Sequence, residues 1–198
     1  MPGPEVGVLA LQGAFACHAQ ILRGLGAGVR EVRTSAQLAE VDGLVIPGGE
    51  STTMTLGIER EGLAGPLQAF RDAGHPIFGT CAGLIMLDAK HLGLIDITAE
   101  RNAFGRQVFS FEEDLPCPQL GPVPVHAVFI RAPWVVDYGA DVTVLAETGG
   151  HPVAVEQDNI LAISFHPELV GEVRLHRRFL DHVRALPRSR SHAPERRQ

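Results

Sequence analysis

The chain has 198 residues, of which 45% are hydrophobic and 20% charged, and this balance favours one globular domain with its own core over a disordered chain. Its formal net charge of −6 argues against a nucleic-acid-binding surface, which would be basic. There is no signal-peptide pattern, no apolar stretch long enough to span a membrane, and no ligand-spaced cysteine or histidine cluster, so we expect a cytoplasmic protein without a bound metal, disulfide framework or membrane segment.

Short apolar runs alternate with helical patterns in the first half of the chain. Strands are predicted at residues 5–11, 29–32, 43–46 and 76–78. Between and after them we expect helices at residues 16–25, 35–40, 51–60, 66–73 and 81–89, the second of them capped by Ser35. This alternation predicts an α/β fold with a parallel sheet covered on both faces.

The second half is richer in strand patterns. These are predicted at residues 108–111, 125–130, 142–146, 153–156 and 161–165. We expect them to form antiparallel hairpins that return to the main sheet, followed by an amphipathic helix at residues 171–184. No interdomain linker is visible, so residues 1–186 are predicted to form a single domain, and the arginine-rich, proline-broken residues 187–198 a mobile tail.

Cys81 lies in a G-x-C-x-G segment, residues 79–83, between a predicted strand and a predicted helix. A nucleophile at such a sharp turn has a strained backbone, and small neighbours allow the close approach that the turn needs. The N-terminus of a helix favours the thiolate, and the amide of Ala82 can point at a developing oxyanion. From these five residues alone, a buried core cysteine is an equally good interpretation.

His166 and Glu168 follow the apolar strand at residues 161–165, with Pro167 between them. Residues two apart in an extended chain face the same side, so the two side chains can converge. A carboxylate that holds one imidazole nitrogen leaves the other free to accept a thiol proton. Without further context, a strand-end histidine beside a solvated glutamate is the commoner arrangement. We expect the remaining histidines to be surface or structural: His18, His75, His91, His126, His151, His176, His182 and His192.

A glycine turn, P-G-G-E-S-T at residues 47–52, follows another buried strand. Two glycines allow unusual dihedral angles, and such a turn can present backbone amides to an anion. The segment lacks the G-K-[ST] ending of a phosphate-binding P-loop. Taken alone, it is also consistent with a simple connection between a strand and a helix.

Together these segments resemble the class I, triad-type glutamine amidotransferases, and more narrowly the glutaminase subunit of pyridoxal 5′-phosphate synthase. The shared motifs are L-Q-G-A (11–14), P-G-G-E-S-T-T-M (47–54), F-G-T-C-A-G-L (78–84), E-R-N-A-F-G-R-Q (100–107), F-I-R-A-P (129–133) and S-F-H-P-E-L (164–169). The resemblance runs from about residue 5 to the last helix and implies a flavodoxin-like three-layer sandwich. One departure is a loop, common in the family, that is missing after Lys90; it leaves details of partner contact open.

The resemblance implies a role for each matching residue. Cys81 would attack the side-chain amide of glutamine to form a glutamyl thioester, with His166 as the base and Glu168 orienting it. The amides of Gly49 and Ala82 would form the oxyanion hole. Glutamine would be bound by Gly49, Glu50, Ser51, Arg101, Ile130 and Arg131. Without the resemblance, Arg101 and Arg131 would be interpreted as surface or structural ion pairs. The reaction needs no cofactor.

The resemblance also implies a partner. Ammonia would pass through a tunnel to a synthase subunit, which combines it with a pentose phosphate and a triose phosphate, and we expect one glutaminase per synthase subunit in a hetero-oligomer. Residues 11–14 would be a docking element. Two alternatives stay open: the glutaminase subunit of another synthase, such as the imidazole glycerol phosphate one, and a non-catalytic binding module on the same fold.

Overall fold

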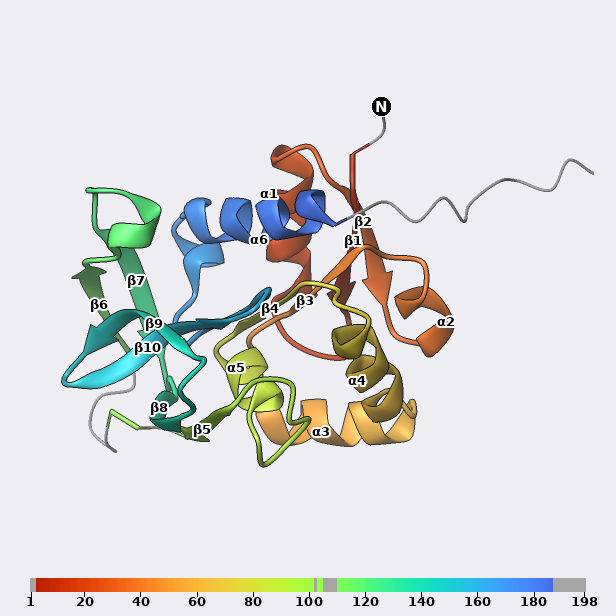
Figure 1. Cartoon of the computed structure of the whole chain (residues 1–198), viewed down its shortest axis with the longest axis horizontal. Helices are drawn as coiled ribbons and strands as arrows, with labels where there is room; N and C mark the ends of the chain where they lie inside the picture. Colours follow the sequence, from red (N-terminus) through yellow and green to blue (C-terminus); the bar gives the residue numbers. More distant parts are fainter. Residues whose placement is uncertain (1–2, 102, 105–109, 187–198) are drawn as a thin grey trace, which may run out of the picture.

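The computed structural model describes residues 3–101, 103–104 and 110–186. At its centre is a seven-stranded sheet in the order β2-β1-β3-β4-β11-β10-β9 (Figure 1). The first five of these strands are mutually parallel, an order typical of flavodoxin-like folds. They are β1 (Glu5–Leu9), β2 (Gly28–Val32), β3 (Gly43–Ile46), β4 (Ile77–Thr80) and β11 (Ile160–Ile163). The predicted fold class is confirmed, whereas the predicted tail at residues 187–198 lies outside the described residues.

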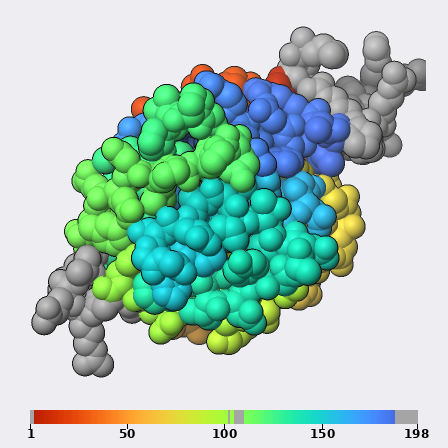
Figure 2. All heavy atoms as spheres, turned by 60° about the vertical axis from the view of Figure 1, so that its left-hand side comes forward, coloured from red at the N-terminus to blue at the C-terminus, as the bar shows by residue number. Residues whose placement is uncertain are grey.

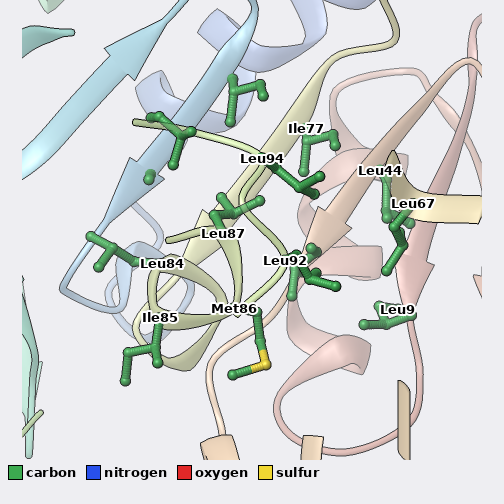
Figure 3. Packing of buried hydrophobic residues seen from close by; sticks show 14 of the residues in the cluster. Leu9, Leu44, Leu67, Ile77, Leu84, Ile85, Met86, Leu87, Leu92 and Leu94 are labelled. Atoms are coloured by element: carbon green, nitrogen blue, oxygen red, sulfur yellow. The ribbon is translucent and has the colours of Figure 1, made fainter. Parts of the chain in front are cut away.

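Helices cover both faces of this sheet. On one face lie α1 (Phe15–Gly24) and α6 (Arg174–Ala185), and on the other α3 (Ser51–Arg60), α4 (Ala64–Asp72) and α5 (Ala82–Leu87) (Figure 1). Because successive side chains of a strand point to opposite faces, Leu44 and Val45 belong to two different core clusters. Figure 3 shows the cluster on the α5 side, where the leucines of that helix lie against the strands.

The short helix α2 (Ser35–Leu38) corrects one prediction. Its N-cap is Thr34 rather than Ser35: the Thr34 side chain accepts a hydrogen bond from the Gln37 amide, and the Gln37 side chain accepts one from the Thr34 amide. This reciprocal pair is a capping box. The residue chosen from the sequence was one position too late because serine and threonine are both good caps.

The second half extends the sheet with antiparallel strands, as predicted. β10 (His151–Gln157) pairs antiparallel with β11 on one side and with β9 (Thr143–Thr148) on the other. Residues of this half form the broad green-to-teal face in Figure 2. Two further antiparallel pairs stand apart from the main sheet: β5 (Ile97–Glu100) with β8 (Trp134–Tyr138), and β6 (Ser110–Leu115) with β7 (Val125–Ile130).

Strands β5 and β8 were not predicted, and part of the strand predicted at residues 108–111 lies outside the described residues. Both missed strands are short and partly exposed, with polar residues such as Thr98 and Asp137 among the apolar ones. They therefore lack the apolar run that signals a buried strand. No helix in the described part of the chain is long and apolar enough to cross a membrane.

Candidate active site

Cys81 stands between β4 and α5, at the carboxyl edge of the sheet. Its φ of 50° is in the left-handed region, which costs free energy for any residue with a Cβ. Its amide donates to the carbonyl of Ile163 on the neighbouring strand at 2.8 Å, which helps to hold the turn. A Cβ on Gly83 would lie 2.1 Å from the Ile46 carbonyl oxygen, so only glycine fits there. The strained strand-to-helix turn predicted from G-x-C-x-G is present.

His166 and Glu168 converge, but not for the reason given by the sequence. His166 Nδ1 lies 2.7 Å from Glu168 Oε1. The strand has already ended at Ile163, and Glu168 lies in a short 3-10 helix, Pro167–Leu169. The prediction of two residues on one face of an extended strand was therefore wrong, although the pairing is right. Pro167 begins this turn, where a missing amide proton costs little.

The electrostatics of the pair favour a charged imidazole. Burial lowers the pKa of His166, but hydrogen bonds and charge interactions with Cys81 and Glu168 outweigh burial and raise this pKa to about 10. Burial raises the pKa of Glu168, but the hydrogen bond with His166 and the charge interactions with His18 and His166 lower it more. The pKa of Glu168 therefore lies below its ordinary value. A raised pKa favours transfer of a proton from Cys81 to the His166 imidazole, and a protonated imidazole beside a cysteine stabilises the thiolate.

The glycine turn after β3 lies against these side chains. Gly48 donates its amide to Thr80 Oγ1 at 2.9 Å and accepts at its carbonyl from the Ala14 amide at 3.2 Å. A Cβ on Gly48 would lie 2.5 Å from His166 Cε1 and 3.2 Å from the Cβ of Cys81. A side chain is thus excluded at this position by Cys81 and the His166 imidazole together.

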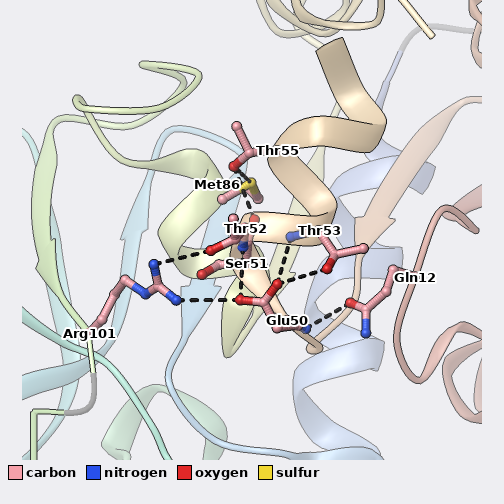
Figure 4. A network of polar contacts seen from close by, with 8 residues as sticks. All are labelled: Gln12, Glu50, Ser51, Thr52, Thr53, Thr55, Met86 and Arg101. Carbon is pink, nitrogen blue, oxygen red and sulfur yellow. Dashed lines mark hydrogen bonds and ion pairs between the residues drawn. The ribbon is translucent and has the colours of Figure 1, made fainter. Parts of the chain in front are cut away.

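Glu50 is engaged in capping α3. Its carboxylate accepts from the amides of Thr52 and Thr53 at 3.0 and 2.7 Å and from the Thr53 hydroxyl at 2.8 Å (Figure 4). These bonds, led by that from the Thr53 amide, lower the pKa of Glu50 to about 2. Arg101 reaches the same carboxylate at 3.4 Å, and Gln12 Oε1 accepts from the Glu50 amide at 2.7 Å. Arg101 is therefore held at the start of α3.

All the predicted site residues line one cavity of about 410 Å³. They are Gly49, Glu50, Ser51, Cys81, Ala82, Arg101, Ile130, Arg131, His166 and Glu168. The Cys81 sulfur lies 3.9 Å from the Ile130 carbonyl oxygen, and Arg131 has a φ of 45°. Part of the E-R-N-A-F-G-R-Q segment lies outside the described residues.

Several residues of the cavity had no predicted role in the site: Gln12, Gly13, Ala14, Gly48, Ile85 and Leu169. The sequence indicates only a docking role for residues 12–14. Gln12 and Ala14 anchor the glycine turn through the hydrogen bonds above, and the L-Q-G-A motif was the signal that pointed to them. Ile85 and Leu169 carry no chemical signal, because apolar side chains are identified as cavity-lining only once the chain is folded.

Two histidines expected to be surface or structural are fully buried beside this site. His18, on α1, and His176, on α6, both have 0% exposure and lie 2.8 Å apart through Nδ1 and Nε2. His18 Nε2 is 3.6 Å from Glu168 Oε2. A surface position is therefore wrong for both. The sequence could not reveal them because both helices carry other polar residues, and local spacing does not show which of these the fold encloses.

Comparison with known proteins agrees with this geometry. Residues 8–185 match the model of the SNO glutamine amidotransferase family. The chain is 52% identical over 194 residues to a protein from Frankia alni named pyridoxal 5′-phosphate synthase subunit PdxT, covering 93% of this chain and 98% of that one. A protein of the same name from Mycolicibacterium vanbaalenii is 53% identical over 192 residues, covering 91% and 98% of the two chains.

Solved structures give the same result. A crystal structure described as a glutamine amidotransferase has a TM-score of 0.85 and 45% identity, and the match covers 91% of this chain and 99% of that chain. PurLQS from Thermotoga maritima matches with a TM-score of 0.73 at 17% identity over 92% of this chain and 100% of that chain, a likeness of fold alone. From its match over residues 8–185 and its close relatives, this chain belongs to the SNO glutamine amidotransferase family.

Proposed function

We propose that the chain hydrolyses glutamine through Cys81, His166 and Glu168, and that it supplies the ammonia to the synthase subunit of pyridoxal 5′-phosphate synthase. Glutamine hydrolysis for a synthase partner is the activity of the family to which the chain belongs. The observation that carries the residue assignment is the hydrogen bond from His166 to Glu168 within the cavity that also contains Cys81.

The reaction begins with transfer of the Cys81 proton to His166, which the raised pKa of His166 favours. The thiolate attacks the carbon of the glutamine side-chain amide, and the imidazolium then gives a proton to the nitrogen that leaves as ammonia. A glutamyl thioester remains on Cys81. Water attacks it, with His166 accepting the water proton, and glutamate is released as the thiol forms again. Glu168 keeps the imidazole oriented and offsets its charge.

The amides of Gly49 and Ala82 would receive the oxyanion of the tetrahedral intermediate. Ala82 is the first residue of α5, so its amide has no acceptor within the helix. The amides on either side of Gly49 are engaged, Gly48 with Thr80 and Glu50 with Gln12, while that of Gly49 makes no hydrogen bond within the described part of the chain. Both amides are thus free to stabilise negative charge.

The cavity wall offers complementary groups for the amino-acid end of glutamine. Arg101 presents a planar guanidinium that suits a carboxylate, and its ties to Glu50 and Thr52 are long, at 3.4 and 3.5 Å. Glu50 is an anion within the same wall, suited to the ammonium group. Ser51, Ile130 and Arg131 complete the binding site that we propose.

The ammonia must be kept from bulk water, where protonation would remove its nucleophilic lone pair. This need favours delivery to a synthase subunit, with one glutaminase per synthase subunit. The relatives named above are subunits of that synthase, which favours it over the imidazole glycerol phosphate one. We also propose that residues 1–186 act as one domain, because β1 and β11, from opposite ends of the chain, share one sheet.

The test is ammonia release from glutamine, measured with the synthase subunit present. Cys81→Ala should abolish it, because no other group in the cavity can form the thioester. Cys17→Ala is the matched control, since Cys17 is exposed and should leave the rate unchanged. A glutamine-like alkylating agent should label Cys81 in the wild-type complex. Continued ammonia release by Cys81→Ala would refute the assignment, and absence of labelling would favour a non-catalytic binding module.

A further inference from the structure

The second carboxylate oxygen of Glu168 faces a buried histidine. Oε1 bonds to His166, whereas Oε2 is buried and has no hydrogen-bond partner in the described part of the chain. His18 Nε2 lies 3.6 Å from Oε2, and both side chains have 0% exposure. A buried carboxylate oxygen without a donor is costly. His18 is therefore placed where the carboxylate needs a donor that the triad does not supply.

A neighbouring contact indicates which nitrogen of His18 carries the proton. Its Nδ1 lies 2.8 Å from His176 Nε2, so one of these rings donates to the other. Glu168 Oε2 can only accept a hydrogen bond, and it lies 3.6 Å from His18 Nε2. A bare His18 Nε2 would set its lone pair against this charged oxygen, whereas an N–H group at the same place is attracted to it. His176 therefore donates from Nε2, His18 accepts at Nδ1, and the His18 proton is on Nε2, toward Glu168.

Burial keeps both rings neutral, as this arrangement requires. Desolvation, the largest effect, lowers the pKa of His18 to about 4 and that of His176 to about 3. The phenylalanine Phe78 packs edge-on against both rings, with centroids 6.3 and 5.3 Å away. A neutral ring has one donor and one acceptor nitrogen, so the direction of the chain from His176 to His18 to Glu168 is defined.

His18 also contacts the glycine turn through one intermediate. Its Nε2 lies 3.2 Å from Thr80 Oγ1, and the same oxygen accepts from the Gly48 amide at 2.9 Å. A hydroxyl oxygen has two lone pairs and can accept both hydrogens. The Nε2–H group of His18 thus lies between the Glu168 carboxylate, which orients His166, and the Thr80 hydroxyl, which holds the glycine turn next to Gly49.

We propose that His18 is a positioning residue for this glutaminase: its Nε2–H holds Glu168 Oε2, and His176 sets its tautomer. The inference rests on the proposed function of the triad. Glu168 must stay ionised while His166 is charged, and an N–H dipole at Oε2 opposes its protonation. The 3.6 Å separation is longer than a hydrogen bond, and contacts of this kind commonly shorten when substrate binds. His18 acts only through Glu168 and Thr80.

Two amide substitutions separate this role from simple core filling. In His18→Gln the side-chain nitrogen can reach the place of Nε2, whereas in the shorter His18→Asn it reaches only the place of Nδ1. In the complex with the synthase subunit, His18→Asn should lower kcat for glutamine about 10- to 100-fold with KM nearly unchanged, as for other groups that orient a catalytic ligand. His18→Gln should keep most of the wild-type kcat. Equal kcat in the two variants would overturn the proposal.

A measurement on the wild-type protein decides the matter if neither variant folds. Magnetic resonance of ¹⁵N-labelled histidine at neutral pH reports which ring nitrogen carries the proton. We expect His18 and His176 both to be protonated at Nε2, and a His18 protonated at Nδ1 would overturn the proposal. This readout does not depend on turnover. A wild-type complex that released no ammonia from glutamine would instead refute the proposed function itself.

Discussion

Replacing Gly48 by alanine tests how closely the glycine turn is fitted to the catalytic pair. Gly48 does not have a positive φ, so alanine is compatible with its backbone. The added Cβ would lie 2.5 Å from His166 Cε1, where ordinary contact begins at 3.4 Å. The imidazole cannot simply turn away, because its Nδ1 is bonded to Glu168 at 2.7 Å. Either the ring or the turn must move by about 1 Å, and a misplacement of that size costs about 100-fold in rate.

The assay is ammonia release from glutamine by the complex with the synthase subunit, together with a thermal unfolding curve. Overpacking at Gly48 should also destabilise the fold by about 1–3 kcal/mol, which still leaves a folded protein. Gly65→Ala is the matched control: Gly65 lies in α4, a Cβ there meets nothing within 4 Å, and the helix should gain up to about 1 kcal/mol. Wild-type activity in Gly48→Ala would refute the reasoning.

Three further predictions concern other parts of the chain. Thr34→Ala, which removes the cap of α2, should cost about 1 kcal/mol in the free energy of unfolding by urea and leave glutaminase activity intact. Arg101→Lys, which replaces the planar guanidinium by a point charge, should raise KM for glutamine more than it lowers kcat. The control Arg71→Lys should change neither constant, and equal KM values in the two variants would contradict a role of Arg101 in binding glutamine. The free energy of unfolding should fall as the pH drops from 6.5 toward 4, because His18 and His176 stay neutral in the folded protein but bind protons once it unfolds. The depressed pKa of His18 alone corresponds to roughly 3 kcal/mol of this loss. A His18→Gln protein whose stability falls as steeply with pH as that of the wild type would refute this prediction.

Local features of the sequence were sufficient for much of the fold. Helix α3 and strand β3 have the predicted bounds, because a run of apolar residues ending in glycines, followed by helical spacing, depends little on distant contacts. The same holds for Cys81: the G-x-C-x-G pattern implies a strained turn wherever the segment lies, and the structure has it. By contrast, the short, half-polar strands β5 and β8 exist because they pair with each other across 33 or more intervening residues.

The sequence by itself determined which chemical groups the protein has and the order in which they follow the strands. Only the tertiary structure decided how they meet, since the pairing of Glu168 with His166 depends on a 3-10 turn, and its contact with His18 depends on α1 packing beside that turn. Burial has the same origin: a histidine on a helix is exposed or enclosed according to what the folded chain places over it. The low pKa of His18 follows from that enclosure, which no local pattern records.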